Sequence, residues 1–311
     1  MSIALSAAID SRFPGLDYLR IFAMLLVTIQ HALSVSNAYE ITSFAGVSLG
    51  QVGVGIFCAI SGFLAFRSDS LPPSSWLRKR LVGLFPAYWL AMLFSFAVTW
   101  ATAAKPFDAT QFVSQMLGIG YFTHGWQLVN IASWFISLIL LCYTLAFLAK
   151  LSTHPRTLLI VFCAAAVALL STHREVDLSR HILTFCLAGC AATFANNYRA
   201  AALAAAGGIL LAVALASLQF AYAGFSLCLL ALALGLALAS RPAASTAAGY
   251  TYEYFLLHGI FLVGAARFVP GPALAKVAIG VGCSVIAAVM LKQITRAITQ
   301  RFSTPSNGLS A

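Results

Sequence analysis

The sequence predicts an all-α membrane protein, a bundle of about ten transmembrane helices. Of the 311 residues, 61 % are apolar and only 8 % are charged, and the mean hydropathy is +0.93. An ordinary soluble domain has about 25 % charged residues. A span with its connection takes about 30 residues, so the chain has room for about ten spans. This composition excludes a soluble enzyme, a disordered chain and a secreted disulfide scaffold.

Apolar runs define the expected spans within one integral-membrane domain, residues 1–311. The runs lie near 17–37, 46–66, 81–102, 131–149, 157–171, 181–198, 201–217, 224–240, 247–266 and 274–292. The softer stretch from Gln111 to Gln127 predicts an interfacial helix and loop. Residues 303–311 are expected to be a frayed tail.

The charge distribution predicts cytoplasmic termini. With ten spans, 13 of the 18 Lys and Arg residues fall on the side of the termini and 5 on the other. Cytoplasmic loops carry the excess of Lys and Arg. The net charge of +10 is thinly spread, which favours cationic membrane loops over a nucleic-acid surface. The first span is expected to be retained. The seven cysteines lie in apolar runs and indicate core residues, with no metal-ligand or disulfide pattern.

Arg20 and His31 share one face of the first expected span. Eleven steps of about 100° bring them to within about 20° of each other, about 16 Å apart along the helix axis. Asp17 lies three residues before Arg20, within reach of a side-chain contact. Ionisable residues inside a bilayer are costly and are functional candidates, and an imidazole suits proton transfer near neutral pH. The alternative is an interfacial anchor with an unrelated packing histidine.

Three consecutive cations precede the third expected span, namely Arg78, Lys79 and Arg80. They are either positive-inside anchors at the membrane boundary or a binding site for a phosphate-bearing ligand. Arginine suits the second role because it binds phosphate through two hydrogen bonds.

The second and ninth expected spans carry further polar or small residues. The segment 53–64 holds several glycines and Ser61, a composition that favours close helix packing. Tyr254 and His258 are four residues apart and share a helix face. His258 is either a hydrogen-bonded packing residue or a functional one.

Taken in order, these segments resemble the integral-membrane acyltransferase family three. The resemblance covers Leu16 to about Tyr143 and again Tyr250 to His258, whereas residues 150–245 match only in hydropathy. The motifs that carry it are Asp17-x2-Arg20-x10-His31, Gly53-Val54-x-Ile56-Phe57-x3-Ser61-Gly62-Phe63-Leu64, Arg80 with Pro86-x-Tyr88-Trp89, Trp134-x2-Ser137, and Tyr252-x-Tyr254-x-Leu256-x-His258.

The resemblance implies a ten-span protein that moves acyl groups, commonly acetyl from acetyl-CoA, onto sugars or other hydroxylated envelope substrates. It implies that His31 is catalytic and that Arg20 sets its site. Arg80 is implied to belong to an Arg-x-x-Arg pair that faces the cytoplasmic acyl donor. Ser61, Trp134, Tyr254 and His258 are the candidates for contact with the substrates.

The sequence departs from the family pattern at two positions. Gly83 stands where the second arginine of the pair belongs, so Arg78 or Lys79 would have to substitute one turn earlier. Ile139 occupies the region in which many relatives carry a glutamate after the Trp–Ser motif. The chain also has no room for the extracytoplasmic domain of some relatives, so acceptor recognition is expected to fall to the outer loops.

The expected function is therefore O-acyl transfer in a bacterial cytoplasmic membrane, with lipid, acyl-CoA and a glycan as partners. Acetyl-CoA is the expected donor substrate, held near Arg78, Lys79 and Arg80, and no metal is expected. His31 acts either as a base or as a residue that is itself acylated. The alternatives are a ten-helix transporter of a metabolite or lipid-linked sugar and a structural subunit of a polymer-export complex. The oligomeric state stays open.

Overall fold

The protein is helical throughout nearly all of the chain that can be described. The computed structural model describes residues 13–36, 40, 43–44, 47–67, 71–102, 108–172, 174–194, 198–215, 220–235 and 241–303. The helices are α2 (Pro14–Val35), α3 (Leu49–Arg67), α4 (Pro73–Ala101), α5 (Ala109–Met116), α6 (Gly120–His124), α7 (Ser133–Leu151), α8 (Pro155–Ser171), α9 (Val176–Ala192), α10 (Tyr198–Leu215), α11 (Ala221–Gly235), α12 (Pro242–Ala248), α13 (Thr251–Phe268) and α14 (Ala273–Ser303). In the described residues, β1 (Ser43–Phe44) and β2 (Val47–Ser48) form a two-residue antiparallel pair. The predicted all-α class is confirmed.

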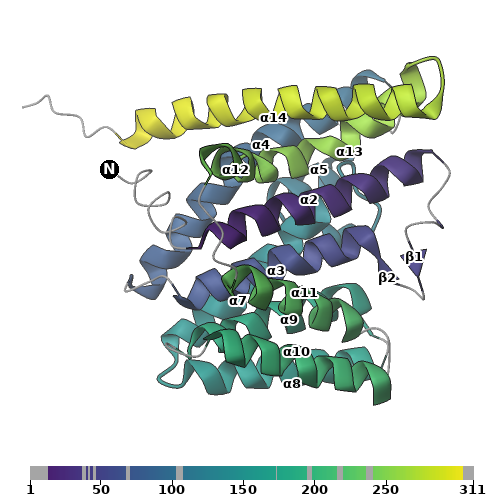
Figure 1. Ribbon diagram of the computed structural model, residues 1–311. Coiled ribbons are helices and arrows are strands. Elements are labelled where there is room, and N and C mark those ends of the chain that lie inside the picture. The colour runs from purple at the N-terminus through teal and green to yellow at the C-terminus, as the bar shows by residue number, and fades with distance from the viewer. Residues whose placement is uncertain are drawn as a thin grey trace, which may run out of the picture. The chain divides into compact units, whose positions relative to one another are not determined.

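Each of the ten expected spans coincides over most of its length with a different helix of the structure, namely α2, α3, α4, α7, α8, α9, α10, α11, α13 and α14 (Figure 1). Within the described residues, five helices are long and apolar enough to cross a membrane, namely α2, α3, α4, α7 and α14. Three shorter helical stretches, α8, Tyr198–Leu210 of α10 and α11, are also apolar. The protein is therefore a polytopic helical membrane protein. The expected tail lies outside the described residues from 304 onward.

The predicted interfacial segment forms two short helices, α5 and α6. Asp108 caps α5 by accepting hydrogen bonds from the backbone N–H groups of Thr110, at 2.8 Å, and Gln111, at 3.2 Å. The Thr110 hydroxyl also donates to this carboxylate, and these bonds hold the pKa of Asp108 below its usual range. Gly118 and Gly125 both have a positive φ, which glycine adopts without a Cβ clash, and they end the two helices.

Helix α4 begins earlier than the sequence predicted. Pro73 opens the helix, so Arg78, Lys79 and Arg80 lie within its first turns rather than in a loop. Proline fits the first turn because the N–H that it lacks has no partner there. The helix has 29 residues, which corresponds to a length of about 43 Å. This exceeds the roughly 30 Å hydrocarbon core, so α4 has length enough to extend beyond it.

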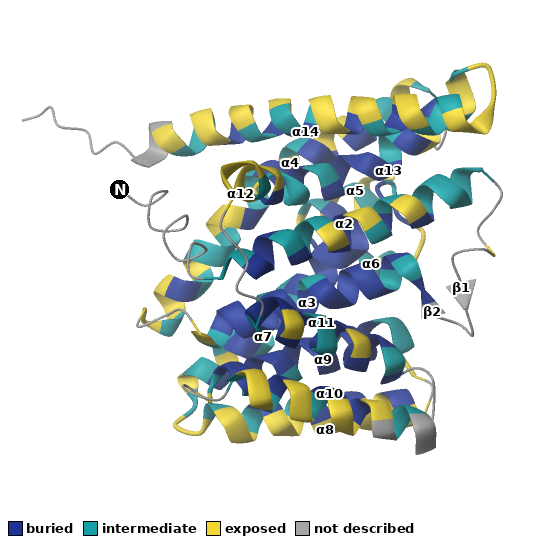
Figure 2. Ribbon diagram, in the orientation of Figure 1, coloured by how far each residue is buried: buried dark blue, intermediate teal, exposed yellow. Residues whose placement is uncertain are grey.

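The chain divides into two compact units. Unit 1 comprises Met1–Arg80 and Trp134–Thr251, and unit 2 comprises Leu81–Ser133 and Tyr252–Ala311. In unit 1, α3 packs against α2, α9 and α11, and α8 and α10 pack on α9 and α11 (Figure 1). Most of α3 is buried (Figure 2). Helix α3 is therefore the central element of unit 1.

Three glycines of α3 allow three neighbouring helices to approach closely. A Cβ added at Gly53 would lie 2.5 Å from the carbonyl oxygen of Ala23 on α2, and one at Gly62 would lie 2.1 Å from that of Phe185 on α9. A Cβ at Gly55 would lie 2.6 Å from the hydroxyl of Ser226 on α11. Real Cβ atoms essentially never lie within 3.0 Å of another heavy atom, so glycine is what permits these approaches without a shift of the neighbouring helix. The predicted packing role of the glycines in segment 53–64 is confirmed.

Large apolar side chains also cover the outer surface of both units. Ile160 of α8 is 60 % exposed, and Leu274 and Ile286 of α14 are 81 % and 63 % exposed. Such side chains would promote aggregation of a soluble protein but are ordinary where lipid is the solvent. The seven cysteines are free thiols; Cys283 is exposed among these outward-facing side chains, whereas Cys58 and Cys142 are buried.

We expect Gly62→Ala to lower the stability of unit 1, because the added methyl group would press on the Phe185 carbonyl of α9. Overpacking of this kind costs roughly 1–3 kcal/mol. The measurement is the melting temperature of the purified protein in detergent. The control is Gly207→Ala in α10, where an added Cβ meets nothing within 4 Å and where alanine is the better helix former. Equal melting temperatures for the two variants would contradict the packing model.

Candidate functional site

The first candidate site lies along α2. Arg20 Nη1 donates to Asp17 Oδ1 at 3.0 Å, and the two side chains are 18 % and 10 % exposed, so the expected contact is present. His31 is half-buried near the other end of the same helix. An axial rise of 1.5 Å per residue places Arg20 and His31 about 16 Å apart along α2. Helix α2 thus carries an ion pair at its start and an imidazole near its end.

A group of aromatic and cationic side chains surrounds Trp76 at the end of unit 1 where α4 begins and α7 ends. We call Trp76, Arg80, Tyr143 and Lys150 the Trp76 cluster. The Trp76 ring lies 5.8 Å from that of Tyr143, and the charged groups of Arg80 and Lys150 lie 5.7 Å and 5.2 Å from its centroid. Two aromatic rings and two cations thus meet at this end of unit 1.

The Trp76 cluster holds buried hydrogen-bond donors that are not satisfied by the protein. Neither Trp76 Nε1 nor Arg80 Nε, both buried, has a hydrogen-bond partner among the residues that the structure describes. Arg78 is exposed and Lys79 is half-buried, so Arg80 is the cation of the three that reaches this cluster. Buried donors are almost always paired in native proteins. Positive charge together with free donors makes this end of unit 1 suited to an anionic ligand.

A second polar group lies at the opposite end of unit 1, where α3, α7 and α9 have one end each. We call Gln51, Trp134, Arg180 and His181 the His181 cluster. His181 is fully buried; its Nε2 lies 2.8 Å from Gln51 Oε1, and its ring lies 5.8 Å from that of Trp134. Arg180, the neighbour of His181 in the chain, is also buried. Helix α9 thus brings a second intramembrane histidine to unit 1.

Contacts around the His181 cluster place it at the end of unit 1 that holds His31. Gln30, the neighbour of His31 in the chain, accepts a hydrogen bond of 2.5 Å from the N–H of Gly50, the neighbour of Gln51. Arg180 pairs with Asp177 and lies over the Tyr222 ring at 4.3 Å from its centroid. The first contact links the end of α2 to the start of α3, and the second links α9 to α11.

Sequence reasoning did not identify His181 or Lys150. His181 opens the expected span 181–198 directly after the charged Arg180, a position typical of a membrane boundary. Lys150 stands at the end of the fourth expected span, where a cation is an ordinary anchor. The sequence does hold a signal for His181. Asp177 and Arg180 are three residues apart on the expected helix, so their charges can pair, and a paired Arg180 allows the neighbouring His181 to lie within the bundle.

The remaining expected residues divide between the units. Ser61 and Trp134 lie in unit 1, half-buried and buried respectively. Tyr254 and His258 lie in unit 2, and their rings stack at 5.8 Å with an interplanar angle of 12°, so the shared helix face is confirmed. His258 Nδ1 lies 2.7 Å from the Phe255 carbonyl oxygen of its own helix. Of the expected site residues, His31, Arg20, Ser61 and Trp134 therefore belong to unit 1. Tyr254 and His258 belong to unit 2.

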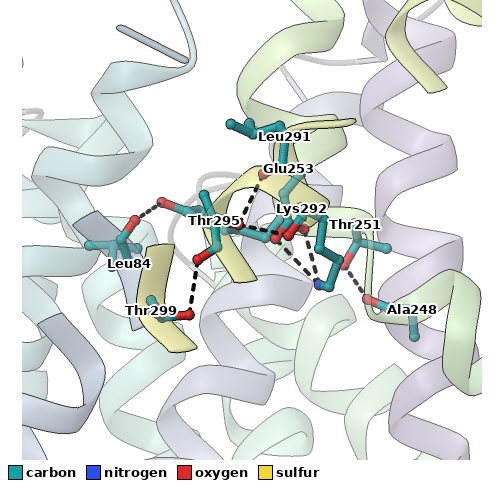
Figure 3. A network of polar contacts seen from close by, with 9 residues as sticks. Leu84, Ala248, Thr251, Glu253, Leu291, Lys292, Thr295 and Thr299 are labelled. Atoms are coloured by element: carbon teal, nitrogen blue, oxygen red, sulfur yellow. Dashed lines mark hydrogen bonds and ion pairs between the residues drawn. The ribbon is translucent and has the colours of Figure 1, made fainter. Parts of the chain in front are cut away.

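Unit 2 contains an ion pair between α13 and α14. Lys292 Nζ lies 3.3 Å from both carboxylate oxygens of Glu253, and the Tyr252 hydroxyl donates to the Leu84 carbonyl oxygen at 2.9 Å (Figure 3). The side chains of Lys292 and Glu253 are 17 % and 8 % exposed. Glu253 of α13 therefore has its counter-charge on α14.

A cavity of about 250 Å³ lies in unit 2 between α4, α13 and the segment before α7. Its most buried polar wall residue is Asn130, whose amide donates to Ser95 Oγ at 3.0 Å and to the Leu256 carbonyl oxygen at 2.9 Å. Its Oδ1 accepts from the N–H of Ala132 at 3.0 Å. These bonds satisfy the side-chain amide of Asn130. In the described part of the chain, no group of three His, Cys, Asp or Glu side chains could hold a metal ion.

The fold and these clusters define a helical membrane protein with ionisable groups buried inside a bundle, as in membrane enzymes and transporters. Residues 13–292 match the acyltransferase 3 family, which is described as an acyltransferase domain. The chain belongs to this family, and it is therefore an acyltransferase of the membrane. The match supports the enzyme over the transporter. No curated protein and no solved structure matches the chain.

We expect Lys292→Met to destabilise unit 2 by roughly 2–4 kcal/mol, because it leaves the Glu253 carboxylate largely buried without its counter-charge. The double variant Glu253→Gln with Lys292→Met removes both charges and is expected to recover most of the loss. Thermal unfolding in detergent measures both effects. A double variant no more stable than Lys292→Met alone would show that the pair does not act through charge.

Proposed function

We propose that the protein is an O-acyltransferase of the bacterial cytoplasmic membrane. It transfers an acetyl group from acetyl-CoA to a hydroxyl of an envelope or exopolysaccharide sugar. In this proposal the ten helices that match the expected spans cross the bilayer, and both termini are cytoplasmic. The observation that carries it is the placement, in unit 1 of a family acyltransferase, of the cationic Trp76 cluster at one end and of His31 near the other.

The Trp76 cluster holds the phosphates of the donor. Arg80 and Lys150 both lie against the Trp76 ring, and buried N–H donors of Arg80 and Trp76 have no partner among the described residues. Arg78 and Lys79 lie on the same first turns of α4 and add positive charge. Gly83, in the place of the family's second arginine, meets nothing within 4 Å. Lys150 of α7 supplies the second cation from another helix.

The reaction joins the two ends of unit 1. The pantetheine arm carries the thioester from the Trp76 cluster past Arg20 toward His31. The hydroxyl oxygen of the acceptor attacks the thioester carbonyl carbon, so a C–O bond forms and the C–S bond breaks. His31 takes the hydroxyl proton and returns it to the CoA thiolate, and the products are the ester and free CoA. Imidazole suits this role because its pKa lies near neutral in water.

We expect His31→Ala to reduce transfer of acetyl from acetyl-CoA to membrane glycans by at least about 100-fold, since general-base catalysis contributes about that much or more. The measurement is incorporation of radiolabelled acetate into alkali-labile ester in washed membranes. The control is His154→Ala, because His154 is exposed at the start of α8. Wild-type rates in His31→Ala would contradict the assignment, and an alkali-labile label on the protein itself would indicate an acylated His31.

We expect Lys150→Ala and Arg80→Ala each to weaken CoA binding by roughly tenfold or more, because a hydrogen bond to a charged group contributes about 1.5–3 kcal/mol. Isothermal titration of the purified protein with CoA measures the affinity. Arg241→Ala is the matched control, since Arg241 is exposed at the start of α12 and lies outside the Trp76 cluster, and its effect is expected to be small. Unchanged CoA affinity in both Lys150→Ala and Arg80→Ala would contradict the donor site.

A further inference from the structure

We propose that His181 binds a hydroxyl group of the acyl acceptor through its Nδ1 atom, with Gln51 and Trp134 as the other walls of the subsite. This inference rests on the proposed function and adds the acceptor side to it. His181 is fully buried, and its Nδ1 has no hydrogen-bond partner in the described ranges of the chain. A buried polar atom without a partner is costly, so a native protein retains one where a ligand or water completes it.

The chemistry of the free position favours a hydroxyl. Nε2 of His181 is engaged by Gln51 at 2.8 Å. If Gln51 accepts from Nε2, Nδ1 is an acceptor; if the Gln51 amide donates, Nδ1 carries the proton and is a donor. A hydroxyl group can both donate and accept, so it satisfies Nδ1 in either tautomer. A carboxylate or an ammonium group satisfies only one of them.

The surroundings of His181 also fit a sugar-like ligand. The Trp134 ring lies 5.8 Å from the imidazole, and the flat apolar face of an indole packs well on the C–H groups of a sugar ring. The nearby charge of Arg180 is already matched by Asp177. The subsite therefore offers a neutral hydrogen-bonding atom beside an aromatic wall, rather than a net charge.

The location fits the acceptor and not the donor. The His181 cluster lies at the end of unit 1 where Gln30 and Gly50 join the His31 end of α2 to the start of α3. The Trp76 cluster, which is proposed to hold the CoA phosphates, lies at the other end. An acceptor bound at His181 therefore lies at the same end as the proposed base.

Two conservative variants separate ligand binding from a structural role. An asparagine amide occupies nearly the place of the Nδ1 atom of histidine, whereas a glutamine amide reaches the place of Nε2. His181→Asn keeps a polar group at the free position and gives up the contact with Gln51. His181→Gln keeps the Gln51 contact and gives up the free position. His181→Leu removes both, and His154→Leu is the surface control.

The experiment supplies radiolabelled acetyl-CoA to washed membranes and measures alkali-labile ester on the endogenous glycans. CoA affinity and melting temperature are measured on the purified proteins. The proposal expects His181→Leu and His181→Gln to lose at least about tenfold in transfer with unchanged CoA affinity. His181→Asn is expected to retain most of the transfer.

Three results would overturn the proposal. Transfer at the wild-type rate in His181→Leu would show that the imidazole is not needed. Full transfer in His181→Gln together with loss in His181→Asn would show that His181 serves only to hold Gln51. Absence of transfer by the wild type, with His31→Ala no different, would remove the proposed function and this inference with it. The first two results leave the proposed function intact.

Discussion

Unit 1 depends on the close approach of three helices to the glycine positions of α3. A lipid bilayer supplies no hydrophobic force between helices, so association relies on dense packing and on hydrogen bonds. Gly53, Gly55 and Gly62 let α2, α11 and α9 come to within contact of the α3 backbone. This packing positions the helix ends, and the helix ends carry the Trp76 and His181 clusters. The positions of His31, Gln51 and the polar residues of α9 all follow from it.

The polar clusters of unit 1 lie at its two ends, because polar side chains in the middle of a bilayer cannot form hydrogen bonds with water. The middle of α3 is formed by apolar side chains such as Ile56, Ala59 and Phe63, all fully buried or nearly so. At one end, aromatic rings lie against cations; at the other, the imidazole of His181 pairs with an amide and Arg180 with a carboxylate. An anionic ligand suits the first end and a neutral hydroxylated ligand the second. This polarity is what a donor with phosphates and an acceptor with hydroxyls require.

Much of the fold could be predicted from hydropathy, because a span in lipid must be apolar for most of its length. The run 46–66 predicted α3 to within three residues of its start, and the softer segment after Gln111 proved to be the short helices α5 and α6. The early start of α4 could not be predicted in this way, because Arg78, Lys79 and Arg80 lowered the local hydropathy although Pro73 begins the helix.

The candidate site was predicted only where its residues share one helix. The pairing of Asp17 with Arg20 and the stacking of Tyr254 on His258 follow from helical spacing. Lys150 beside Trp76 and Gln51 beside His181 join residues separated by 74 and 130 positions. Spacing along the chain does not encode such contacts, which arise where Trp76 meets Tyr143 of α7 and where α3 packs on α9. Lys150 and His181 could therefore be recognised as cluster residues only from the three-dimensional structure.

In the proposed reaction, the donor and the acceptor reach unit 1 from opposite faces of the membrane. The most direct measurement supplies acetyl-CoA to sealed vesicles of each orientation and follows the release of free CoA thiol. We expect release when acetyl-CoA meets the face that bears Arg78, Lys79 and Arg80, and none when it meets only the other face. Release from the opposite face alone would contradict it.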